Sequence, residues 1–120
     1  MSIKIIIAED ELIIAKANAI MLTKLGYEVK LVKNAADAIA SAKTFNPDLI
    51  LMDINFKKDQ ATGIEAAIEI RKNNNVPIIF TSGSRPDKES MEQLSNASHL
   101  AKPLNFELLK QKILEYTSLA

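Results

Sequence analysis

Residues 48–55 read DLILMDIN, a short apolar run that is closed by Asp53 and two further residues. Continuous apolar runs of this length are typical of strands whose two faces are both covered by helices, which is the usual situation in a parallel sheet. The run therefore predicts a buried strand over residues 48–52, with Asp53 directly after its carboxyl end. Residues 3–8 and 76–81 have the same character and predict two more central strands.

Helical patterns separate these apolar runs. Gly26 ends the first and Asn46-Pro47 ends the second, because glycine terminates helices and the residue before a proline avoids the helical conformation. Asn105 is placed to cap the last helix. The full pattern predicts five strands, at residues 3–8, 28–33, 48–52, 76–81 and 98–101, and five helices, at residues 11–25, 35–44, 64–72, about 88–94 and 106–116. Strands that alternate with helices predict a single α/β domain over residues 1–120 with a parallel sheet.

The character of each strand predicts its place in the sheet. The strand at residues 28–33, EVKLVK, alternates charged and apolar residues, and the strand at residues 98–101 is very short, so we expect both at the edges. Right-handed crossovers then favour a doubly wound five-stranded sheet in the order 2-1-3-4-5. In that order the chain reverses direction between strands one and three. Ligands of open α/β sheets bind at such a point, outside the carboxyl ends of the strands.

The composition excludes several classes of function. The chain has 120 residues, with 15 Lys+Arg against 15 Asp+Glu, and no cysteine. Disulfides, thiolate metal sites and cysteine nucleophiles are therefore excluded, and the balanced charge gives no sign of a nucleic-acid surface. The apolar residues 5–8 are followed at once by acidic residues, so they form neither a signal peptide nor a membrane span. We expect a cytoplasmic protein that contacts neither membranes nor nucleic acid directly.

Polar side chains gather at the carboxyl ends of the predicted strands. They are Glu9 and Asp10 after strand one, Asp53 after strand three, Thr81 and Ser82 after strand four, and Lys102 after strand five. Three carboxylates side by side need a compensating cation. A cluster of oxygen donors without His or Cys suits Mg²⁺ or Mn²⁺ rather than zinc. A metal, a carboxylate, a lysine and a hydroxyl together are the groups that phosphoryl transfer uses.

Each of these residues also has an ordinary structural interpretation. Asp53 fits a turn after a strand, and Glu9-Asp10 fits an acidic first helical turn. Ser82-Gly83 fits a turn, and Lys102-Pro103 fits a loop that enters a helix. Each feature taken singly is readily explained by chance. Their joint placement after four strands of one sheet is much harder to explain by chance, and it favours a functional site.

Five strings in the sequence are similar to the motifs of the receiver domain of two-component response regulators, the CheY-like family. They are IIIAEDE at residues 5–11, DLILMDIN at 48–55, GIEAA at 63–67, VPIIFTSG at 76–83 and AKP at 101–103. They stand in the family's order and near its spacing, and the resemblance covers essentially the whole chain. It implies a flavodoxin-like fold and a phospho-acceptor function.

The resemblance implies a role for each residue of the predicted metal site. Asp53 is the implied phospho-acceptor. Asp10 would bind Mg²⁺ or Mn²⁺ directly together with Asp53, and Asn55 would contribute its backbone carbonyl. Glu9 stands where the family more often has Asp, and it would act at the metal through water or as a second ligand.

The resemblance also implies the groups that bind the phosphoryl group. Lys102 would pair with the phospho-acceptor and then with a phosphoryl oxygen. Ser82 is preferred over Thr81 as the hydroxyl that hydrogen-bonds the phosphoryl group, because it stands at the family's distance after a proline. Gly83 would offer its backbone N–H. The family's usual conformation implies a cis peptide bond at Lys102-Pro103, which proline makes accessible.

Two features depart from the family's common pattern. His99 occupies the switch position, where Tyr or Phe is more usual. A switch role and a half-buried edge-strand residue with its ring nitrogen in water are both compatible with the sequence. The loop at residues 55–62 is about two residues longer than in the shortest members. It carries Lys57 and Lys58, for which a solvated loop is favoured over a partner contact.

Together these observations predict a signalling phospho-acceptor. It would receive its phosphoryl group from a phosphohistidine on a sensor histidine kinase or a phosphotransfer protein, and small donors such as acetyl phosphate should also serve. A change of conformation at the face of the fourth helix, the fifth strand and the last helix would carry the signal to an unknown target. We expect no enzymatic turnover beyond self-phosphorylation and autodephosphorylation.

Several alternatives are weighed against this prediction. A free-standing regulator and a receiver fragment of a hybrid histidine kinase or DNA-binding regulator are both compatible with the sequence. A phosphohydrolase of the haloacid-dehalogenase type would carry its nucleophile after the first strand, whereas Asp53 follows the third. A flavin-binding module would need a phosphate loop rich in Ser, Thr and Gly after strand one, where this chain has acidic residues. A degenerate receiver would lack some of the site residues, whereas this chain has a suitable residue at every expected acidic, hydroxyl and lysine position.

Overall fold

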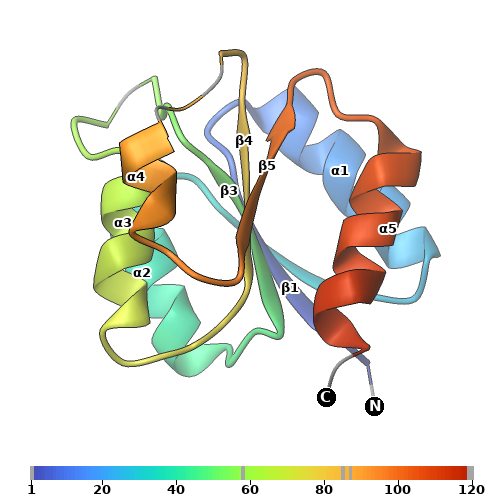
Figure 1. The fold of residues 1–120 in the computed structure, drawn as a ribbon. Helices are drawn as coiled ribbons and strands as arrows, with labels where there is room; N and C mark the ends of the chain where they lie inside the picture. The colour runs from blue at the N-terminus through green and yellow to red at the C-terminus, as the bar shows by residue number, and fades with distance from the viewer. Residues whose placement is uncertain (1, 58, 85, 87, 119–120) are drawn as a thin grey trace.

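The computed structural model describes residues 2–57, 59–84, 86 and 88–118. Among these residues, five strands form one parallel sheet in the order β2-β1-β3-β4-β5, as the sequence predicts (Figure 1). The strands are β1 (Lys4–Ala8), β2 (Glu28–Val32), β3 (Leu49–Asp53), β4 (Ile78–Ser82) and β5 (Ala97–Ala101). The helices are α1 (Leu12–Lys24), α2 (Ala35–Thr44), α3 (Gly63–Arg71), α4 (Lys88–Glu92) and α5 (Phe106–Thr117).

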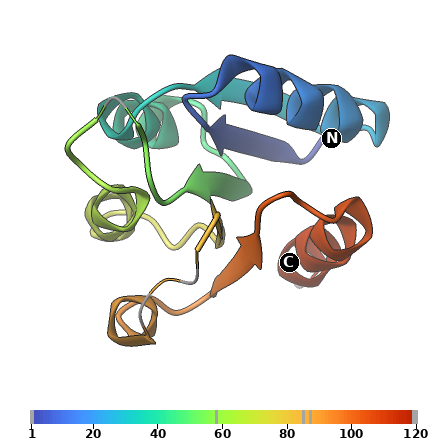
Figure 2. The ribbon, with the colours of Figure 1, turned by 90° about the horizontal axis from the view of Figure 1, so that it is seen from above.

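The sheet lies between two layers of helices. Helices α1 and α5 cover one face, and α2, α3 and α4 cover the other (Figures 1 and 2). Successive side chains of a strand point to opposite faces, so Ile5 and Ile7 pack with Leu22 and Ile113, whereas Ile6 packs in the cluster on the other face. Burial of a large apolar side chain contributes about 1.5–3 kcal/mol, so these two clusters are the main source of stability.

The edge strands are the two that the sequence predicts. Glu28 and Lys30 of β2 are exposed, and none of the residues of β5 is fully buried. The prediction that β5 is very short is wrong, because it has five residues, as do the other four strands. The charged residues of β2 resist pairing with another chain. The three central strands keep the continuous apolar character from which the fold was inferred, and every residue of β3 and β4 is buried.

Two central strands end one residue later than the sequence predicts. β3 ends at Asp53 itself, and β4 ends at Ser82. β4 also begins later than predicted, because Pro77 has no N–H to donate and the Val76 N–H donates to Asn74 Oδ1 at 2.9 Å. Asp53 and Ser82 therefore belong to the sheet and not to the loops that follow it.

Capping residues explain where three helices begin. Asn105 accepts two hydrogen bonds at the start of α5, as predicted. Asn34, which was not predicted as a cap, accepts one at the start of α2. Thr62 and Glu65 form a reciprocal capping box at the start of α3. α4 is shorter than expected and ends at Glu92. No helix within the described residues has the length and apolar character needed to cross a bilayer.

Helix α1 begins at Leu12, and the side chain of the preceding Glu11 makes no capping hydrogen bond. Its first turn contains no acidic residue. The interpretation of Glu9-Asp10 as an acidic first helical turn is therefore wrong. Both residues lie between the end of β1 and the helix, where their side chains are available to a site at the edge of the sheet.

The guanidinium of Arg71, in the last turn of α3, holds the amino ends of β4 and β5 in place. It donates to the carbonyl oxygens of Val76 at 2.7 Å, Ser95 at 2.6 Å and Asn96 at 2.9 Å. The Ile78 N–H also donates to the Asn96 carbonyl, at 3.1 Å. These contacts lie at the end of the sheet opposite the carboxyl ends of the strands.

Candidate functional site

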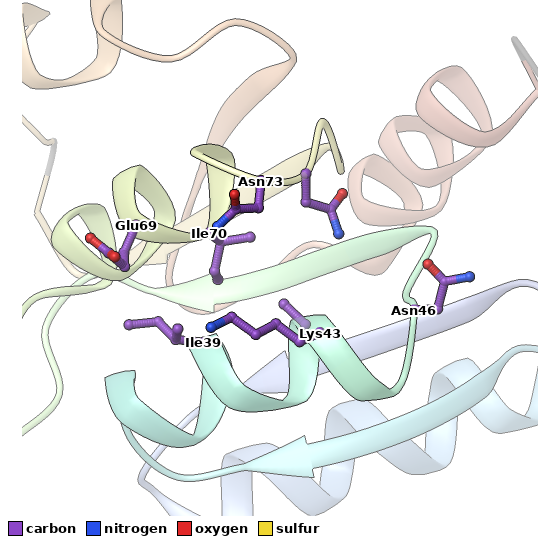
Figure 3. A pocket seen from close by; sticks show the side chains of 8 residues that line it. Ile39, Lys43, Asn46, Glu69, Ile70 and Asn73 are labelled. Atoms are coloured by element: carbon purple, nitrogen blue, oxygen red, sulfur yellow. The ribbon is translucent and has the colours of Figure 1, made fainter.

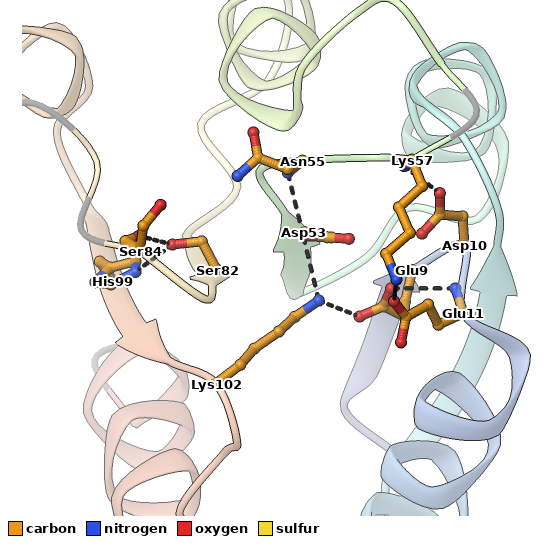
Figure 4. Close-up of polar contacts among 10 residues, drawn as sticks. All are labelled: Glu9, Asp10, Glu11, Asp53, Asn55, Lys57, Ser82, Ser84, His99 and Lys102. Atoms are coloured by element: carbon orange, nitrogen blue, oxygen red, sulfur yellow. Dashed lines mark hydrogen bonds and ion pairs between the residues drawn. The ribbon is translucent and has the colours of Figure 1, made fainter.

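The carboxyl ends of β1, β3, β4 and β5 bring the predicted site residues to one edge of the sheet (Figure 4). Ala8 is in register with Met52, and Asp53 is in register with Thr81. The residues that follow β1 therefore lie beside the end of β3. The topology predicted this edge as the ligand-binding edge, and the structure places the polar residues there.

Three carboxylates meet at this edge. Glu9, Asp10 and Asp53, here called the acidic group, each place one oxygen within 4.8 Å of the others. Glu9 is 4% exposed and Asp53 is 3% exposed, so water compensates little of their charge. Buried carboxylates in contact stay ionised only beside positive charge. The oxygen donors and the excess negative charge of the acidic group fit a hard divalent cation such as Mg²⁺ or Mn²⁺.

Lys102 supplies positive charge within the acidic group. Its ammonium lies 2.8 Å from Glu9 Oε1 and 3.4 Å from Asp53 Oδ1, so it is closer to Glu9 than to its expected partner Asp53. Burial lowers the pKa of Lys102, but the hydrogen bonds and charges of Glu9 and Asp53 outweigh burial and raise its pKa overall. The Lys102-Pro103 peptide is cis, as predicted. The Lys102 N–H donates to the Ser82 carbonyl at 2.8 Å, which ties Lys102 to the end of β4.

The Asp53 carboxyl group is harder to ionise than an ordinary aspartate. Burial first, and then the charge of Glu9, raise the pKa of Asp53 from 3.8 to about 6. Lys102 and the Asn55 N–H, which donates to Asp53 Oδ1 at 3.2 Å, oppose the rise without cancelling it. A cation bound beside Asp53 would favour its ionised form. Carboxyl groups with such shifts are concentrated at functional sites.

Gly63 lets the start of α3 approach the backbone of Asp53. A Cβ atom at Gly63 would lie 2.0 Å from the Asp53 carbonyl oxygen, so no other residue fits without movement of the backbone. The Gly63 N–H donates to the Ile54 carbonyl at 2.8 Å. The sequence marked Gly63 as the residue before a predicted helix and as the first residue of the string GIEAA, and it gave no sign of this contact. Gly83, in contrast, is exposed, and a Cβ atom there would meet nothing within 4 Å.

The Ser82 hydroxyl is engaged on the β5 side of the site. Ser82 Oγ lies 2.8 Å from His99 Nε2, and the hydroxyl donates to the Ser84 carbonyl. Figure 4 shows Ser82, Ser84 and His99 grouped together, apart from the acidic group. His99 is half-buried, as one of its two interpretations expected, but its Nε2 faces Ser82 rather than water. The sequence predicted neither the contact of Ser82 with His99 nor the hydrogen bond that Ser82 donates to the Ser84 carbonyl.

The loop between β3 and α3 reaches back to the residues that follow β1. The Lys57 N–H donates to Asp10 Oδ2, and the Lys57 ammonium pairs with Glu11. A solvated loop was the favoured prediction for Lys57. Its side chain is indeed 73% exposed, but these two contacts were not predicted. Lys58, the second lysine of that prediction, lies outside the described residues.

Cavities adjoin the site on two sides. One of about 840 Å³ is lined by Glu9 and Asp10 together with residues from α1, β2 and α2. Another, of about 410 Å³, lies between α3 and α4 and reaches Asn55 and Ser82. A cavity of about 320 Å³ between α2 and α3 is remote from the site, because Asn46, which lines it, precedes β3 (Figure 3). The site is therefore open to a reaction partner from outside the sheet.

Comparison with known proteins identifies the family. The family model described as the response regulator receiver domain matches residues 5–114. The chain is 31% identical over 112 residues to the Bacillus subtilis protein named uncharacterized transcriptional regulatory protein YvcP, covering 92% of this chain and 46% of that protein. It is 36% identical over 107 residues to the transcriptional regulatory protein PdtaR of Mycobacterium tuberculosis, covering 85% of this chain and 50% of that protein. The chain thus spans about half the length of these curated relatives.

Solved structures agree with this assignment. The receiver domain of the sensor histidine kinase PA1611 from Pseudomonas aeruginosa, described with a magnesium ion coordinated in its active-site cleft, superposes with a TM-score of 0.85 at 29% identity, covering 98% of this chain and 99% of that chain. The signal receiver domain of a modulated diguanylate cyclase from Desulfovibrio desulfuricans superposes with a TM-score of 0.84 at 30% identity, covering 99% and 96% of the two chains. With its CheY-like fold and a family match over nearly its whole length, this chain belongs to the response regulator receiver domain family, the phospho-acceptors of two-component signalling.

Proposed function

We propose that Asp53 is the phospho-acceptor of this receiver domain and that its phosphorylation depends on Mg²⁺ or Mn²⁺. One observation carries the proposal: a buried aspartate with a raised pKa ends the central strand β3, between two further carboxylates and Lys102. This arrangement joins a nucleophile, ligands for a metal and a cation for phosphoryl oxygens, which are the requirements of phosphoryl transfer.

The acidic group would hold the metal ion. Asp10 and Asp53 would bind it directly, the Asn55 carbonyl would add a neutral oxygen, and Glu9 would act through water or as a second ligand. When bound, the ion would neutralise the negative charge that builds up as the phosphoryl group meets the carboxylates. Glu9 also positions Lys102, because the Lys102 ammonium lies nearest to Glu9 Oε1, at 2.8 Å.

The transfer is a substitution at phosphorus. An Asp53 carboxylate oxygen forms the new P–O bond in line with the P–N bond of a phosphohistidine, which breaks. The leaving imidazole nitrogen keeps the bonding electron pair and takes a proton from solvent, so Asp53 loses no proton in the step. Lys102 would exchange its ion pair with Asp53 for one with a phosphoryl oxygen. The Ser82 hydroxyl and the Gly83 N–H would donate hydrogen bonds to the other phosphoryl oxygens.

Phosphorylation would move Ser82 and thereby switch the protein. The phosphoryl group adds about −1.5 to −2 units of charge at the edge of the sheet. To donate to it, the Ser82 hydroxyl must leave the Ser84 carbonyl and His99 Nε2. The His99 side chain would then turn inward into the space that Ser82 leaves, which would change the face of α4, β5 and α5. Such a change is a shift between two conformations that exist before phosphorylation.

The donor we propose is a phosphohistidine on a sensor histidine kinase or a phosphotransfer protein. Two similar proteins are named as kinases: the PA1611 protein mentioned above and the autoinducer sensor kinase/phosphatase CqsS of Vibrio cholerae, to which the chain is 29% identical over 116 residues. The receiver would act as a substrate of the kinase and a slow hydrolase of its own acyl phosphate, without steady turnover of external substrates.

The test is incubation with acetyl phosphate, and separately with beryllofluoride, with and without Mg²⁺. We expect intact mass to show one added phosphoryl group only when the metal is present, and NMR to show a beryllofluoride complex under the same condition. Asp53→Asn should abolish both. A protein that stays unmodified in saturating Mg²⁺ would contradict the proposal. Steady turnover of a phosphomonoester would instead indicate a phosphohydrolase.

A further inference from the structure

In the described part of the loop at residues 54–62, Lys57 contacts two of the acidic residues after β1. Its backbone N–H donates to Asp10 Oδ2, and its side-chain ammonium pairs with Glu11. Figure 4 shows the Lys57 side chain running from the loop past Asp10 toward Glu9 and Glu11. One residue thus contacts two consecutive acidic residues, and the first of these belongs to the acidic group.

The position of Lys57 is fixed by contacts on both sides of it in the chain. Phe56 is 5% exposed and packs in the core cluster that contains β3 and α3. Asp59 accepts hydrogen bonds from the Ala35 N–H at 2.9 Å and the Ala61 N–H at 3.2 Å, which ties the loop to the start of α2. These contacts hold the backbone at Lys57 near the acidic residues, and the ion pair with Glu11 places its ammonium.

Lys57 and Lys102 contact different acidic residues of the site. Lys102 contacts Glu9 and Asp53, whereas Lys57 contacts Glu11 and the backbone of Lys57 contacts Asp10. The Lys57 ammonium pairs with Glu11, the residue after Asp10, so it lies next to the Asp10 side of the acidic group, whereas Lys102 contacts Glu9 and Asp53.

We propose that Lys57 is a built-in cation that competes with the divalent metal ion for the Asp10 side of the acidic group and thereby lowers the metal affinity. This inference rests on the proposed metal-dependent function. Like charges at short range repel, so an ion bound by Asp10 raises the free energy of the nearby ammonium, and the ammonium raises that of the ion. Asp10 Oδ2, which now accepts from the Lys57 N–H, is also one of the two oxygens that Asp10 offers to a metal. Metal binding by Asp10 is therefore coupled to the hydrogen bond that the Lys57 N–H donates to Asp10 Oδ2.

The first test is calorimetric titration of Mg²⁺ into the wild type, Lys57→Gln and the control Lys72→Gln. Lys72 is a matched control, because it is an exposed lysine in an ion pair with Glu69 at 2.9 Å, after the end of α3 and away from the site. We expect Lys57→Gln to bind Mg²⁺ about three- to tenfold more tightly, and Lys72→Gln to bind like the wild type. Loss of an exposed ion pair changes folding stability little, so the variants should unfold alike.

Three further measurements test the charge of Lys57 and its backbone contact separately. Lys57→Arg keeps the charge and should keep the wild-type affinity. The advantage of Lys57→Gln should shrink as salt rises, because salt screens exposed charges. In NMR spectra, the amide signal of residue 57 should shift on Mg²⁺ titration in all of these proteins, because every variant retains the backbone N–H that donates to Asp10.

The outcomes distinguish this inference from the proposed function. A wild type that binds no divalent ion and forms no acyl phosphate would overturn the proposed function and this inference with it. A wild type that binds Mg²⁺ and is phosphorylated, with Lys57→Gln equal to or weaker than Lys72→Gln, would overturn the competition alone. Equal tightening in both variants would mean that net charge acts at a distance, and it would overturn a specific role for Lys57.

Discussion

Ion pairs with Lys102 stabilise Glu9 and Asp53 of the acidic group. On the other side of the site, hydrogen bonds of the Ser82 hydroxyl connect Ser82 to His99 and to the following loop. Lys102 lies within 2.8 Å and 3.4 Å of two carboxylates, and Asp53 ends a fully buried strand. Ser82 Oγ has a ring nitrogen at 2.8 Å, and its hydroxyl donates to a carbonyl in the following loop. Charged contacts in a buried setting are strong and resist rearrangement, while a hydroxyl changes partners at small cost.

In the proposed function, this difference gives chemistry to one side of the site and switching to the other. The acidic group would keep its geometry so that a metal and a phosphoryl group meet Asp53 in line. The Ser82 and His99 pair would change its geometry when the phosphoryl group arrives. Asp53→Asn, Gly63→Ala and a change of pH test the side of the acidic group, and His99→Ala tests the side of Ser82 and His99.

Asp53→Asn should have the largest effect, because it removes the nucleophilic oxygen while keeping the shape of the side chain. We expect no acyl phosphate from acetyl phosphate and Mg²⁺ by intact mass. Asp37→Asn, which changes an exposed aspartate in the first turn of α2, is the matched control and should be phosphorylated normally. Phosphorylation of Asp53→Asn at the wild-type level would assign the acceptor to another carboxylate.

Gly63→Ala should destabilise the fold by about 1–3 kcal/mol, because the new methyl group overlaps the Asp53 carbonyl oxygen and forces α3 away from the end of β3. Urea unfolding measures the change. Gly83→Ala is the control, since a Cβ atom there meets nothing within 4 Å and should cost less than about 1 kcal/mol. Equal stability of the two variants would show that the start of α3 moves freely relative to Asp53.

The stability of the metal-free protein should fall as pH rises through about 6, the raised pKa of Asp53. The folded state holds this proton more tightly than the unfolded state, whose pKa is near 3.8. The contribution of Asp53 is therefore fully present below about pH 3.8 and is lost above about pH 6. A shift of about two pKa units is worth about 3 kcal/mol, which sets the size of the expected loss of stability.

Urea unfolding of the wild type and Asp53→Asn across this pH range isolates the contribution of Asp53. The wild type should be the less stable of the two at neutral pH, and the gap should narrow as the pH falls. Saturating Mg²⁺ should also narrow it by favouring the ionised carboxylate. A gap that is the same at every pH would assign the ordinary aspartate pKa to Asp53.

His99→Ala should have the smallest effect on stability, about 0.5–1.5 kcal/mol for the loss of its hydrogen bond with Ser82. Phosphorylation of Asp53 should continue, because His99 is grouped with Ser82 and Ser84, apart from the acidic group (Figure 4). NMR with beryllofluoride should show the usual shifts around Asp53 but smaller shifts in β5 and α5 than in the wild type. Ser98→Ala, which removes a neighbouring hydroxyl that contacts Tyr116, is the control. Wild-type shifts in β5 and α5 would exclude His99 from the switch.

Most of the fold followed from the sequence because its signals are local. The apolar runs at β1, β3 and β4, together with the charged pattern of β2, were sufficient for the strand order. The convergence of Glu9, Asp10, Asp53 and Lys102 followed from topology, since the carboxyl ends of parallel strands share one edge. Strand ends were less certain, because Pro77 and the Asn74 side chain decide where β4 begins.

The missed features depend on contacts between residues far apart in the chain. Lys57 lies 46 positions from Glu11, and no local pattern announces their ion pair. The closeness of Lys102 to Glu9 and the contact of Ser82 with His99 depend on side-chain conformations that the sheet register alone does not specify. The tight fit at Gly63 is likewise a matter of backbone approach, for which a glycine before a helix is only a weak signal.

The three carbonyl contacts of Arg71 would give the proposed switch a fixed pivot. The guanidinium holds the start of β5 against α3 through Ser95 and Asn96, at the end of the sheet farthest from Asp53. With that end held, we expect a displacement at the other end of β5 to tilt the strand and not to move it along its axis. A small movement near Ser82 would thereby tilt the outer surface that a partner protein would read.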